Sequence, residues 1–242
     1  MKIWGVIPAR WGSTRLGGKL LKPIAGKPLI LRVWENVMQA ELLDGVIIAT
    51  DDERIANIVE RSGADVMMTP PGFKCGTERV AYVAERLSAD YFVDVQGDEL
   101  FVEGWMIDRL IADAKETKPE MATIAAPLLA ESEYRDPHTV KVVCDRDGNA
   151  LYFSRSPIPF LQKSDVNRLK HIGVYLYRDD VLKRLAELPV SPLEHAESLE
   201  QLRALENGIP IRCVVVDEAA ALFAVNTEAD LVRAEQLLSR KG

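Results

Sequence analysis

Three fixed cations stand close together near the N-terminus, in a segment rich in glycine and hydroxyl side chains. The segment follows a short apolar run and reads Pro8-Ala9-Arg10-Trp11-Gly12-Ser13-Thr14-Arg15-Leu16-Gly17-Gly18-Lys19. Arg10, Arg15 and Lys19 could neutralise charge on several oxygens, while backbone N–H groups exposed at the glycines could cradle the same anion. A triphosphate requires this combination, although the spacing is not that of a Walker A motif. On spacing alone, a solvated polar loop is the alternative interpretation.

A second set of ligand-type side chains follows a later apolar run, residues 91–95. Gln96 offers both a hydrogen-bond donor and an acceptor, so its amide could bind a polar ligand edge. Asp98 offers a hard oxygen ligand, which suits a magnesium ion that bridges a triphosphate. The structural alternative is a turn in which Asp98 only caps the segment that follows. Beside the loop of cations, the binding interpretation is the better one.

Alternating apolar and amphipathic runs predict the elements that position these residues. Strands are predicted at residues 3–7, 45–49, 66–68 and 91–95, with helices between them, the third from 77 to 87. Pro28 lies in the first turn of the first helix, and Asp51 can cap the second. This alternation implies right-handed crossovers and a mostly parallel, doubly wound, Rossmann-like α/β sheet. Such sheets bind ligands beyond the carboxyl ends of their strands, so both sets of side chains are expected at one edge.

The second half of the chain is less regular. Strands at 140–144 and 150–153 flank a hairpin turn signal at 145–148, and further strands are predicted at 170–177 and 209–216. Ser191 has the features of a helix cap, and the helix is expected to run to about Glu206 and end at Asn207-Gly208. A closing helix from 227 to 238 has Thr227 as its cap. The pattern predicts a single domain over residues 1–242, with a smaller α+β subdomain inserted at about 127–180.

Composition excludes several classes of partner. The chain has 242 residues, of which 48% are hydrophobic and 28% charged, and its formal net charge is −7. Bulk attraction to nucleic acid or to an anionic membrane is therefore not expected, and an anionic substrate needs a local basic cluster. No apolar run approaches the ~20 residues that span a bilayer. The N-terminal run is typical of a core strand and not of a secretion signal, and the three cysteines have no metal-type spacing, so a cytoplasmic protein is predicted.

Several different short blocks of sequence, spread in order over nearly the whole chain, carry a resemblance to a known family. The first block is the loop from Ile7 to Lys19, followed by Gly26-Lys27-Pro28. The others are Ala49-Thr50-Asp51-Asp52, Gly76-Thr77-Glu78-Arg79, Gln96-Gly97-Asp98-Glu99, Val140-Lys141-Val142-Val143, Ala150-Leu151-Tyr152-Phe153-Ser154-Arg155, Lys170-His171-Ile172-Gly173-Val174-Tyr175 and Ser198-Leu199-Glu200-Gln201-Leu202-Arg203. Together these blocks resemble the 3-deoxy-manno-octulosonate cytidylyltransferases (CMP-Kdo synthetases). Each block is weak alone, but the set is highly specific.

The resemblance implies a fold of the nucleotide-diphospho-sugar transferase type and a magnesium-dependent reaction with CTP. In this reaction the anomeric hydroxyl of the sugar acid Kdo (3-deoxy-D-manno-octulosonate) attacks the α-phosphorus of CTP and pyrophosphate leaves. The product is CMP-Kdo, which is used in lipopolysaccharide synthesis. The implied catalytic residues are Arg10, Lys19 and Asp98, and the implied metal ligands are Asp98 and Asn226. The implied nucleotide-binding residues are Ala9, Arg10, Ser13, Arg15, Lys19, Gly76, Arg79 and Gln96. A homodimer is also expected, because the resembling enzymes are typically dimeric.

The resemblance places Kdo against five residues of the second half, namely Arg155, His171, Tyr175, Glu200 and Gln201. Arg155 could pair with the sugar carboxylate through two parallel hydrogen bonds. His171 and Tyr175 alternate with apolar residues along a predicted strand, so both side chains point to one face. Without the resemblance, Glu200 and Gln201 would be interpreted as solvated helix surface.

The chain departs from the family pattern at a few positions. Asn226 stands where the second metal ligand is usually Asp, which removes one negative charge although the amide oxygen can still coordinate. Leu176 stands where Gly is common, beside the expected sugar face, and Cys75 stands where Ser is common. We hypothesise that metal binding is weakened, or that the accepted acid differs. The alternatives are a cytidylyltransferase for 8-amino-Kdo or a nonulosonic acid, and a degenerate nucleotide-binding subunit.

Overall fold

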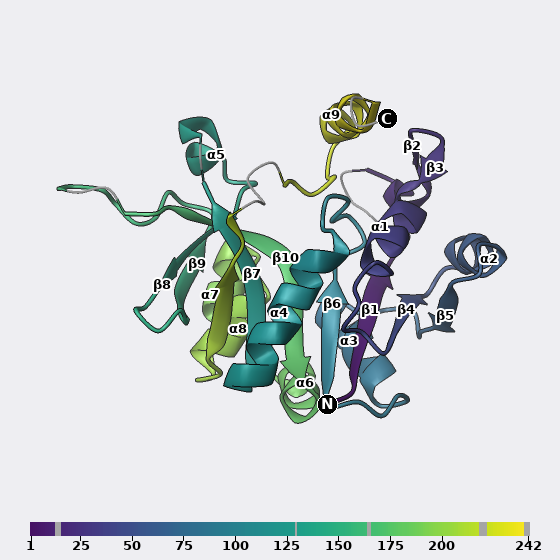
Figure 1. The fold of residues 1–242 in the computed structure, drawn as a ribbon, viewed down its shortest axis with the longest axis horizontal. Helices are drawn as coiled ribbons and strands as arrows, with labels where there is room; N and C mark the ends of the chain where they lie inside the picture. The colour runs from purple at the N-terminus through teal and green to yellow at the C-terminus, as the bar shows by residue number, and fades with distance from the viewer. Residues whose placement is uncertain (13–15, 129, 164–165, 218–221, 240–242) are drawn as a thin grey trace. The chain divides into compact units, whose positions relative to one another are not determined.

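The computed structural model describes residues 1–12, 16–128, 130–163, 166–217 and 222–239 (Figure 1). The chain divides into two compact units, one formed by Met1–Asp108 with Phe223–Gly242 and the other by Arg109–Leu222. The subdomain predicted at about 127–180 falls inside the second unit. Within the described residues, no helix is both long enough and apolar enough to cross a membrane.

The first unit is built on a parallel sheet. Its strands are β1 (Ile3–Ala9), β4 (Gly45–Thr50), β5 (Asp65–Met68) and β6 (Tyr91–Val95), and their order in space is β6-β1-β4-β5. Every pairing among them is parallel. The connecting helices are α1 (Leu29–Val37), α2 (Glu53–Arg61) and α3 (Gly76–Ala84). This alternation of strands and helices confirms the predicted α/β fold class.

The strand order places a topological switch at the carboxyl end of β1. From β1 the chain moves outward to β4 and β5, and then returns to place β6 on the other side of β1. At such a point, ligands of α/β proteins bind beyond the carboxyl ends of the strands. The loop after β1 and the loop after β6 both leave the sheet at this edge, as the sequence predicted.

The starts of two helices differ in detail from the prediction. Pro28 is the residue before α1 and not part of its first turn. Asp52, not Asp51, caps α2, because its side chain accepts a hydrogen bond from the backbone N–H of Arg54 at 2.9 Å. Asp51 instead forms an ion pair with Arg79 at 3.0 Å. Asp51 and Asp52 have the same capping chemistry, but the ion pair with Arg79 holds Asp51 away from the helix start and leaves Asp52 as the cap.

A short hairpin and the C-terminal helix complete the first unit. The 3-10 helix η1 (Lys19–Leu21) leads into β2 (Pro23–Ile24) and β3 (Lys27–Pro28). Helix α9 (Glu228–Ser239) lies beside this hairpin (Figure 1), and Glu228 pairs with Lys22 at 2.6 Å. Thr227 caps α9 as predicted, since its hydroxyl accepts from the backbone N–H of Asp230 at 3.2 Å. Helix α4 (Gly104–Thr117) spans the boundary of the two units.

The second unit contains a mixed sheet and several helices. Its elements are β7 (Met121–Pro127), α5 (Glu131–Arg135), β8 (Lys141–Cys144), β9 (Ala150–Ser154), β10 (Leu169–Arg178), α6 (Asp179–Glu187), α7 (Pro192–Glu197), α8 (Gln201–Glu206) and β11 (Ile211–Val215). Strand β7 pairs in parallel with β11 and antiparallel with β10, and β10 pairs antiparallel with β8. Strands β8 and β9 form the predicted hairpin.

The helix predicted from Ser191 to about Glu206 is wrong, because the chain breaks it into α7 and α8. The predicted capping box at Ser191 and Glu194 is present, and Asn207 follows α8 as predicted. Between the helices, Ser198 adopts a left-handed conformation with φ 53°. This conformation costs a residue other than glycine free energy, so the surrounding contacts must stabilise it. Those contacts come from Arg155 and are described below.

Candidate functional site

Three segments remote in sequence bring Lys19, Asp98 and Asn226 together in the first unit. Lys19 begins η1, Asp98 lies in the loop after β6, and Asn226 precedes α9. The Lys19 ammonium forms an ion pair with the Asp98 carboxylate and lies 3.4 Å from Asn226 Oδ1. The backbone N–H of Val225 also donates to the Asp98 carbonyl at 3.0 Å. Lys19 and Asp98 thus meet at the carboxyl edge of the parallel sheet, as predicted.

Two glycines allow these loops to approach each other. A Cβ atom on Gly97 would lie 3.1 Å from the carbonyl oxygen of Pro8 and 3.2 Å from Leu20 Cδ2. The loop after β6 therefore packs against the loop after β1 only because residue 97 has no side chain. Gly18, the residue before η1, adopts φ 63°, in the left-handed region, and Lys19 follows it toward Asp98.

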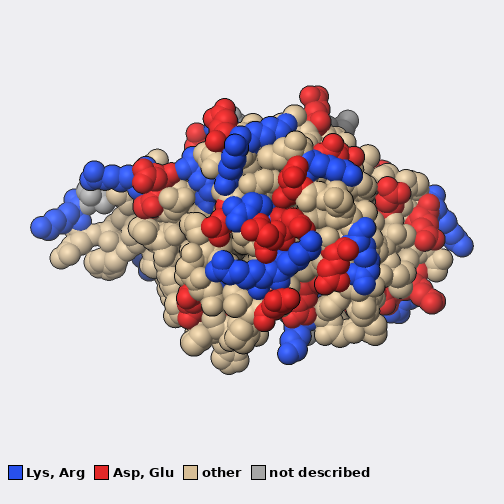
Figure 2. Space-filling model, turned by 90° about the horizontal axis from the view of Figure 1, so that it is seen from below, with Lys and Arg blue, Asp and Glu red and all other residues tan. Residues whose placement is uncertain are grey.

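The other predicted residues of the first loop are placed in part. Ala9 ends β1 and is fully buried, and Arg10 follows it and is exposed. Ser13 and Arg15 lie outside the described residues. On the face drawn in Figure 2, basic and acidic side chains are interspersed, so neither sign of charge covers that face.

The donor set at Asp98 and Asn226 fits a magnesium ion. Both side chains present an oxygen to the same ammonium group, so the two oxygens converge on one position of positive charge. Magnesium binds through one or two carboxylates together with substrate phosphates and water. Among the described residues, no group of three His, Cys, Asp or Glu side chains could hold a metal, so a magnesium ion here would take its other ligands from phosphate oxygens and water.

Asp230 fixes the segment that carries Asn226, and the sequence reasoning missed it. Its carboxylate accepts hydrogen bonds from the backbone N–H groups of Asn226 at 3.0 Å and Thr227 at 2.8 Å, and from the Thr227 hydroxyl at 2.8 Å. A Thr cap followed three residues later by Asp is the signal that could have revealed this contact. Asp230 therefore orients the backbone from which the Asn226 amide reaches Lys19.

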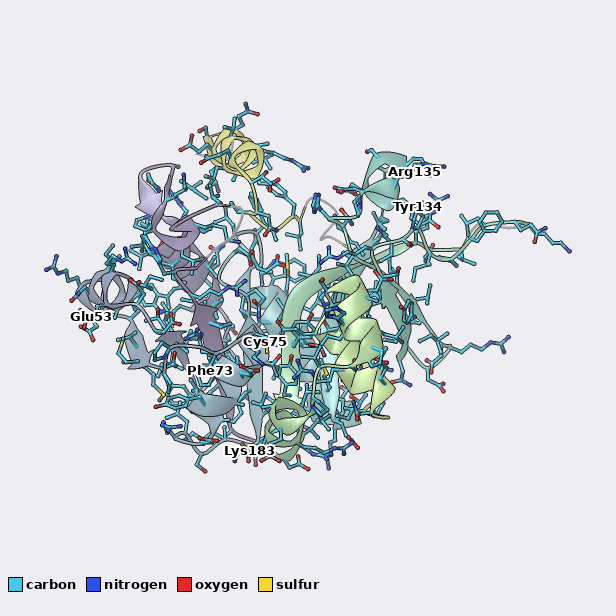
Figure 3. The ribbon with its side chains drawn as sticks, turned by 180° about the vertical axis from the view of Figure 1, so that it is seen from behind. Glu53, Phe73, Cys75, Tyr134, Arg135 and Lys183 are labelled. Atoms are coloured by element: carbon cyan, nitrogen blue, oxygen red, sulfur yellow. The ribbon has the colours of Figure 1, made fainter. Side chains whose placement is uncertain are left out.

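Gln96 and Gly76 also meet at the carboxyl ends of the strands. The Gln96 amide nitrogen donates to the two carboxylate oxygens of Asp94 at 2.9 and 3.1 Å, and Asp94 is buried. Because a carboxylate only accepts hydrogen bonds, this contact fixes which end of the amide points at Asp94. A Cβ atom on Gly76 would lie 2.7 Å from the same nitrogen, so Gln96 occupies space that only glycine leaves open. Gly76 is the first residue of α3, and Cys75, labelled in Figure 3, directly precedes it.

Arg79 is a buried member of an internal ion pair. Its guanidinium donates to the Asp51 carboxylate at 3.0 Å and to the Thr69 hydroxyl, and the residue is 2% exposed. The structure therefore assigns Arg79 to the packing of α3 against the segments after β4 and β5. Its predicted contact with a nucleotide stays a prediction.

In the second unit, three predicted substrate residues form one cluster. The rings of His171 and Tyr175 lie 5.1 Å apart between centroids, on one face of β10 as predicted. The Tyr175 hydroxyl donates to Gln201 Oε1 at 3.1 Å, and His171 Nε2 lies 3.0 Å from the Thr123 hydroxyl. Burial lowers the pKa of His171 to about 3, so the ring is neutral near pH 7.

Gln201 has a donor available for a ligand. The residue is 3% exposed, and its Nε2 has no hydrogen-bond partner among the described residues. An unpaired buried amide N–H costs free energy unless something else accepts from it. The interpretation of Gln201 as solvated helix surface is therefore excluded, and the side chain is suited to an oxygen-rich ligand. Glu200 directly precedes α8.

Arg155 uses several of its donors within the protein. Its guanidinium donates to the backbone carbonyls of Glu197 at 2.7 Å, Pro137 at 3.0 Å and Ser198 at 3.3 Å. Glu197 in turn accepts from the Ser154 hydroxyl at 2.6 Å and the Arg155 backbone N–H at 2.9 Å. Within the described parts of the chain, these bonds use three of the five guanidinium N–H groups. Arg155 therefore stabilises the break between α7 and α8, a role that the sequence did not reveal.

Comparison with known proteins gives a consistent result. The family model of the cytidylyltransferases matches residues 4–212. The 3-deoxy-manno-octulosonate cytidylyltransferase of Syntrophotalea carbinolica is 46% identical, and the alignment covers 97% of this chain and 98% of the relative. The enzyme of the same name from Geobacter metallireducens is 45% identical over 99% of both chains.

A solved structure extends this likeness to three dimensions. It is that of CMP:2-keto-3-deoxy-manno-octonic acid synthetase complexed with CTP, with a TM-score of 0.94, 38% identity and complete coverage of both chains. The chain belongs to the 3-deoxy-manno-octulosonate cytidylyltransferase family.

Proposed function

We propose that this protein transfers the cytidylyl group of CTP to the anomeric hydroxyl of Kdo and releases pyrophosphate. The product, CMP-Kdo, is an activated sugar for lipopolysaccharide synthesis. The observation that carries the proposal is the meeting of Lys19, Asp98 and Asn226 at the switch point of the parallel sheet. The names of the relatives and the CTP complex of the structural neighbour support the choice of both substrates.

The residues of the first unit position and neutralise the triphosphate. Arg10 and Lys19 supply fixed positive charge beside the loop, and such charge stabilises the oxygens on which negative charge develops during transfer. Asp98 and Asn226 would hold a magnesium ion, which supplies further charge stabilisation on the phosphate oxygens. The protein's contribution is to align the attacking hydroxyl with the α-phosphorus.

We propose that Gln96 recognises the base of the nucleotide by a hydrogen bond. With its amide nitrogen held by Asp94, its oxygen is the end left to accept a hydrogen bond. The exocyclic amino group of cytosine is a donor, whereas uracil has an acceptor at the same position. This orientation favours CTP over UTP.

The cluster in the second unit is the proposed site of the sugar acid. Gln201 Nε2 offers a buried donor, and the neutral His171 ring interacts with hydroxyl groups without adding charge. The Arg155 guanidinium suits a carboxylate. Leu176, a departure from the family pattern, directly follows Tyr175 in β10 and is fully buried. This departure motivates a second candidate, transfer to a modified acid such as 8-amino-Kdo.

Pyrophosphate release tests the proposal. Four nucleoside triphosphates are each combined with Kdo, 8-amino-Kdo and a nonulosonic acid in the presence of magnesium. We expect turnover with CTP and Kdo, and a loss on the order of 10²-fold in kcat for Lys19→Met, which removes one fixed donor. Faster turnover of another acid would establish the second candidate, and no turnover of any pair would leave a nucleotide-binding subunit.

The accompanying properties are proposals of the same kind. We propose a magnesium-dependent cytoplasmic enzyme that acts as a homodimer. Removal of magnesium with a chelator should abolish turnover, and its return should restore it. Sedimentation equilibrium should give twice the mass of 27.0 kDa.

A further inference from the structure

We propose that Trp11 and Arg54 are positioning residues for the triphosphate site, because Arg54 holds the Trp11 indole against Gly18 and so sets the place of Lys19. Neither residue belongs to the catalytic or binding sets considered above. The inference rests on the proposed use of CTP, and it concerns only contacts within the first unit.

The guanidinium of Arg54 is fixed from helix α2. Asp52, the cap of α2, accepts from Arg54 Nε at 2.9 Å and from its terminal nitrogen at 2.6 Å, in addition to the backbone N–H of Arg54. A two-point contact of this kind sets the plane of the guanidinium as well as its position. Asp52 therefore holds the Arg54 guanidinium in one orientation beside the start of α2.

The Trp11 ring lies directly over this guanidinium. The central carbon of the Arg54 group is 3.4 Å from the ring centroid, which is close stacking for a cation on an indole. Trp11 follows Arg10 immediately, so the stack fixes the first loop where it leaves β1. Helix α2 thereby determines where the loop begins.

The far end of the same indole lies against Gly18. A Cβ atom on Gly18 would lie 2.8 to 3.3 Å from three atoms of the six-membered ring, so the indole fills the space that a side chain would take. Gly18 directly precedes Lys19, the first residue of η1, and its carbonyl accepts from the backbone N–H of Leu21 at 3.0 Å. A ring held at one end by α2 and packed at the other on Gly18 therefore fixes the residue from which Lys19 reaches Asp98.

Calorimetric titration with CTP tests this role in the full chain. The variants are Trp11→Leu, Arg54→Leu and the double variant, with Trp11→Phe as a conservative replacement that keeps an aromatic face. Arg61→Leu is the matched control, since Arg61 is an exposed residue of the same helix and its loss changes net charge equally. Each single leucine variant should weaken CTP binding about two- to fivefold, as expected for a stacked cation at an exposed site.

Coupling distinguishes positioning from a general effect. The double variant should bind CTP no more weakly than either single variant, because both remove the same contact. Trp11→Phe should recover most of the affinity, Arg61→Leu should match wild type, and the KM for Kdo should not change. Additive losses, or an equal loss in Arg61→Leu, would overturn the inference. A wild-type protein that binds CTP but does not turn over Kdo would instead refute the proposed acceptor, and one that binds no CTP would refute both.

Discussion

Alanine at position 76 should separate activity from stability. The first residue of α3 has an ordinary helical backbone, so alanine fits its conformation and gains up to about 1 kcal/mol of helix propensity. Its Cβ would nevertheless lie 2.7 Å from Gln96 Nε2, whereas ordinary contact begins near 3.4 Å. The amide must therefore move by about 0.7 Å, while the backbone around it stays in place.

The size of the effect follows from this displacement. Moving the amide disturbs its hydrogen bonds of 2.9 and 3.1 Å to Asp94, which costs about 1 kcal/mol and offsets the gain in propensity. The free energy of unfolding of Gly76→Ala should thus stay within about 1 kcal/mol of wild type. Misplacement of a substrate-binding group by about 1 Å costs up to 10²-fold in rate, so kcat/KM for CTP should fall by about 10- to 10²-fold.

Urea unfolding and initial rates of pyrophosphate release measure the two quantities. Gln96→Ala should lower kcat/KM similarly, and the double variant should lose little more than either single variant. The KM for Kdo provides the internal control. If Gly76→Ala kept full activity while Gln96→Ala lost it, the position of the Gln96 amide would not matter, and the assigned base contact would be wrong.

Three further perturbations follow from the structure. Asn226→Asp should lower severalfold the magnesium concentration for half-maximal pyrophosphate release, because a second carboxylate strengthens a site of hard oxygens; an unchanged titration would contradict the assignment. His171→Gln should weaken the dependence of stability on acid. In the wild type the folded pKa of about 3 lies below the unfolded value of about 6.5, so between pH 7 and pH 5 the unfolded chain binds a proton that the folded chain does not. This protonation lowers the free energy of unfolding of the wild type by about 2 kcal/mol over that range, and urea unfolding at both pH values measures it. Arg203→Met should lower the free energy of unfolding by about 3–5 kcal/mol, because it leaves Glu194 charged and buried, and Glu194→Leu in the same chain should recover most of that loss.

Local chemistry explains what the sequence could predict. The parallel sheet followed from the alternation of apolar and amphipathic runs, and the edge where ligands bind followed from the sheet. The hairpin of β8 and β9 and the cap at Ser191 have short-range signals, since the residues that form them are neighbours in sequence. The meeting of Lys19 and Asp98 was predictable from the sheet, because the segments that carry them follow β1 and β6, which pair with each other.

Contacts between remote segments explain what the sequence could not predict. The sequence after Ser191 has an uninterrupted helical pattern. The helix nevertheless ends and restarts where the Arg155 guanidinium donates hydrogen bonds to the carbonyls of Glu197 and Ser198. The choice between Asp51 and Asp52 as a cap likewise depends on Arg79, which comes from another helix. In each case a long side chain satisfies polar groups whose neighbours in sequence give no sign of it.

Charge compensation at Asp98 links nucleotide and metal binding. The Lys19 ammonium balances this carboxylate in the structure, and it lies at the same edge of the sheet as the loop for the triphosphate. If Lys19 turned toward phosphate oxygens alone, Asp98 would be left as an uncompensated, largely buried charge, which is unfavourable. A magnesium ion held by Asp98 and Asn226 would remove that conflict, since it would balance Asp98 and free Lys19 at once. We therefore expect magnesium and CTP each to bind more tightly in the presence of the other, by the same factor. Asn226 would make this dependence stronger, because an amide adds an oxygen without adding the negative charge that would hold the metal before CTP arrives.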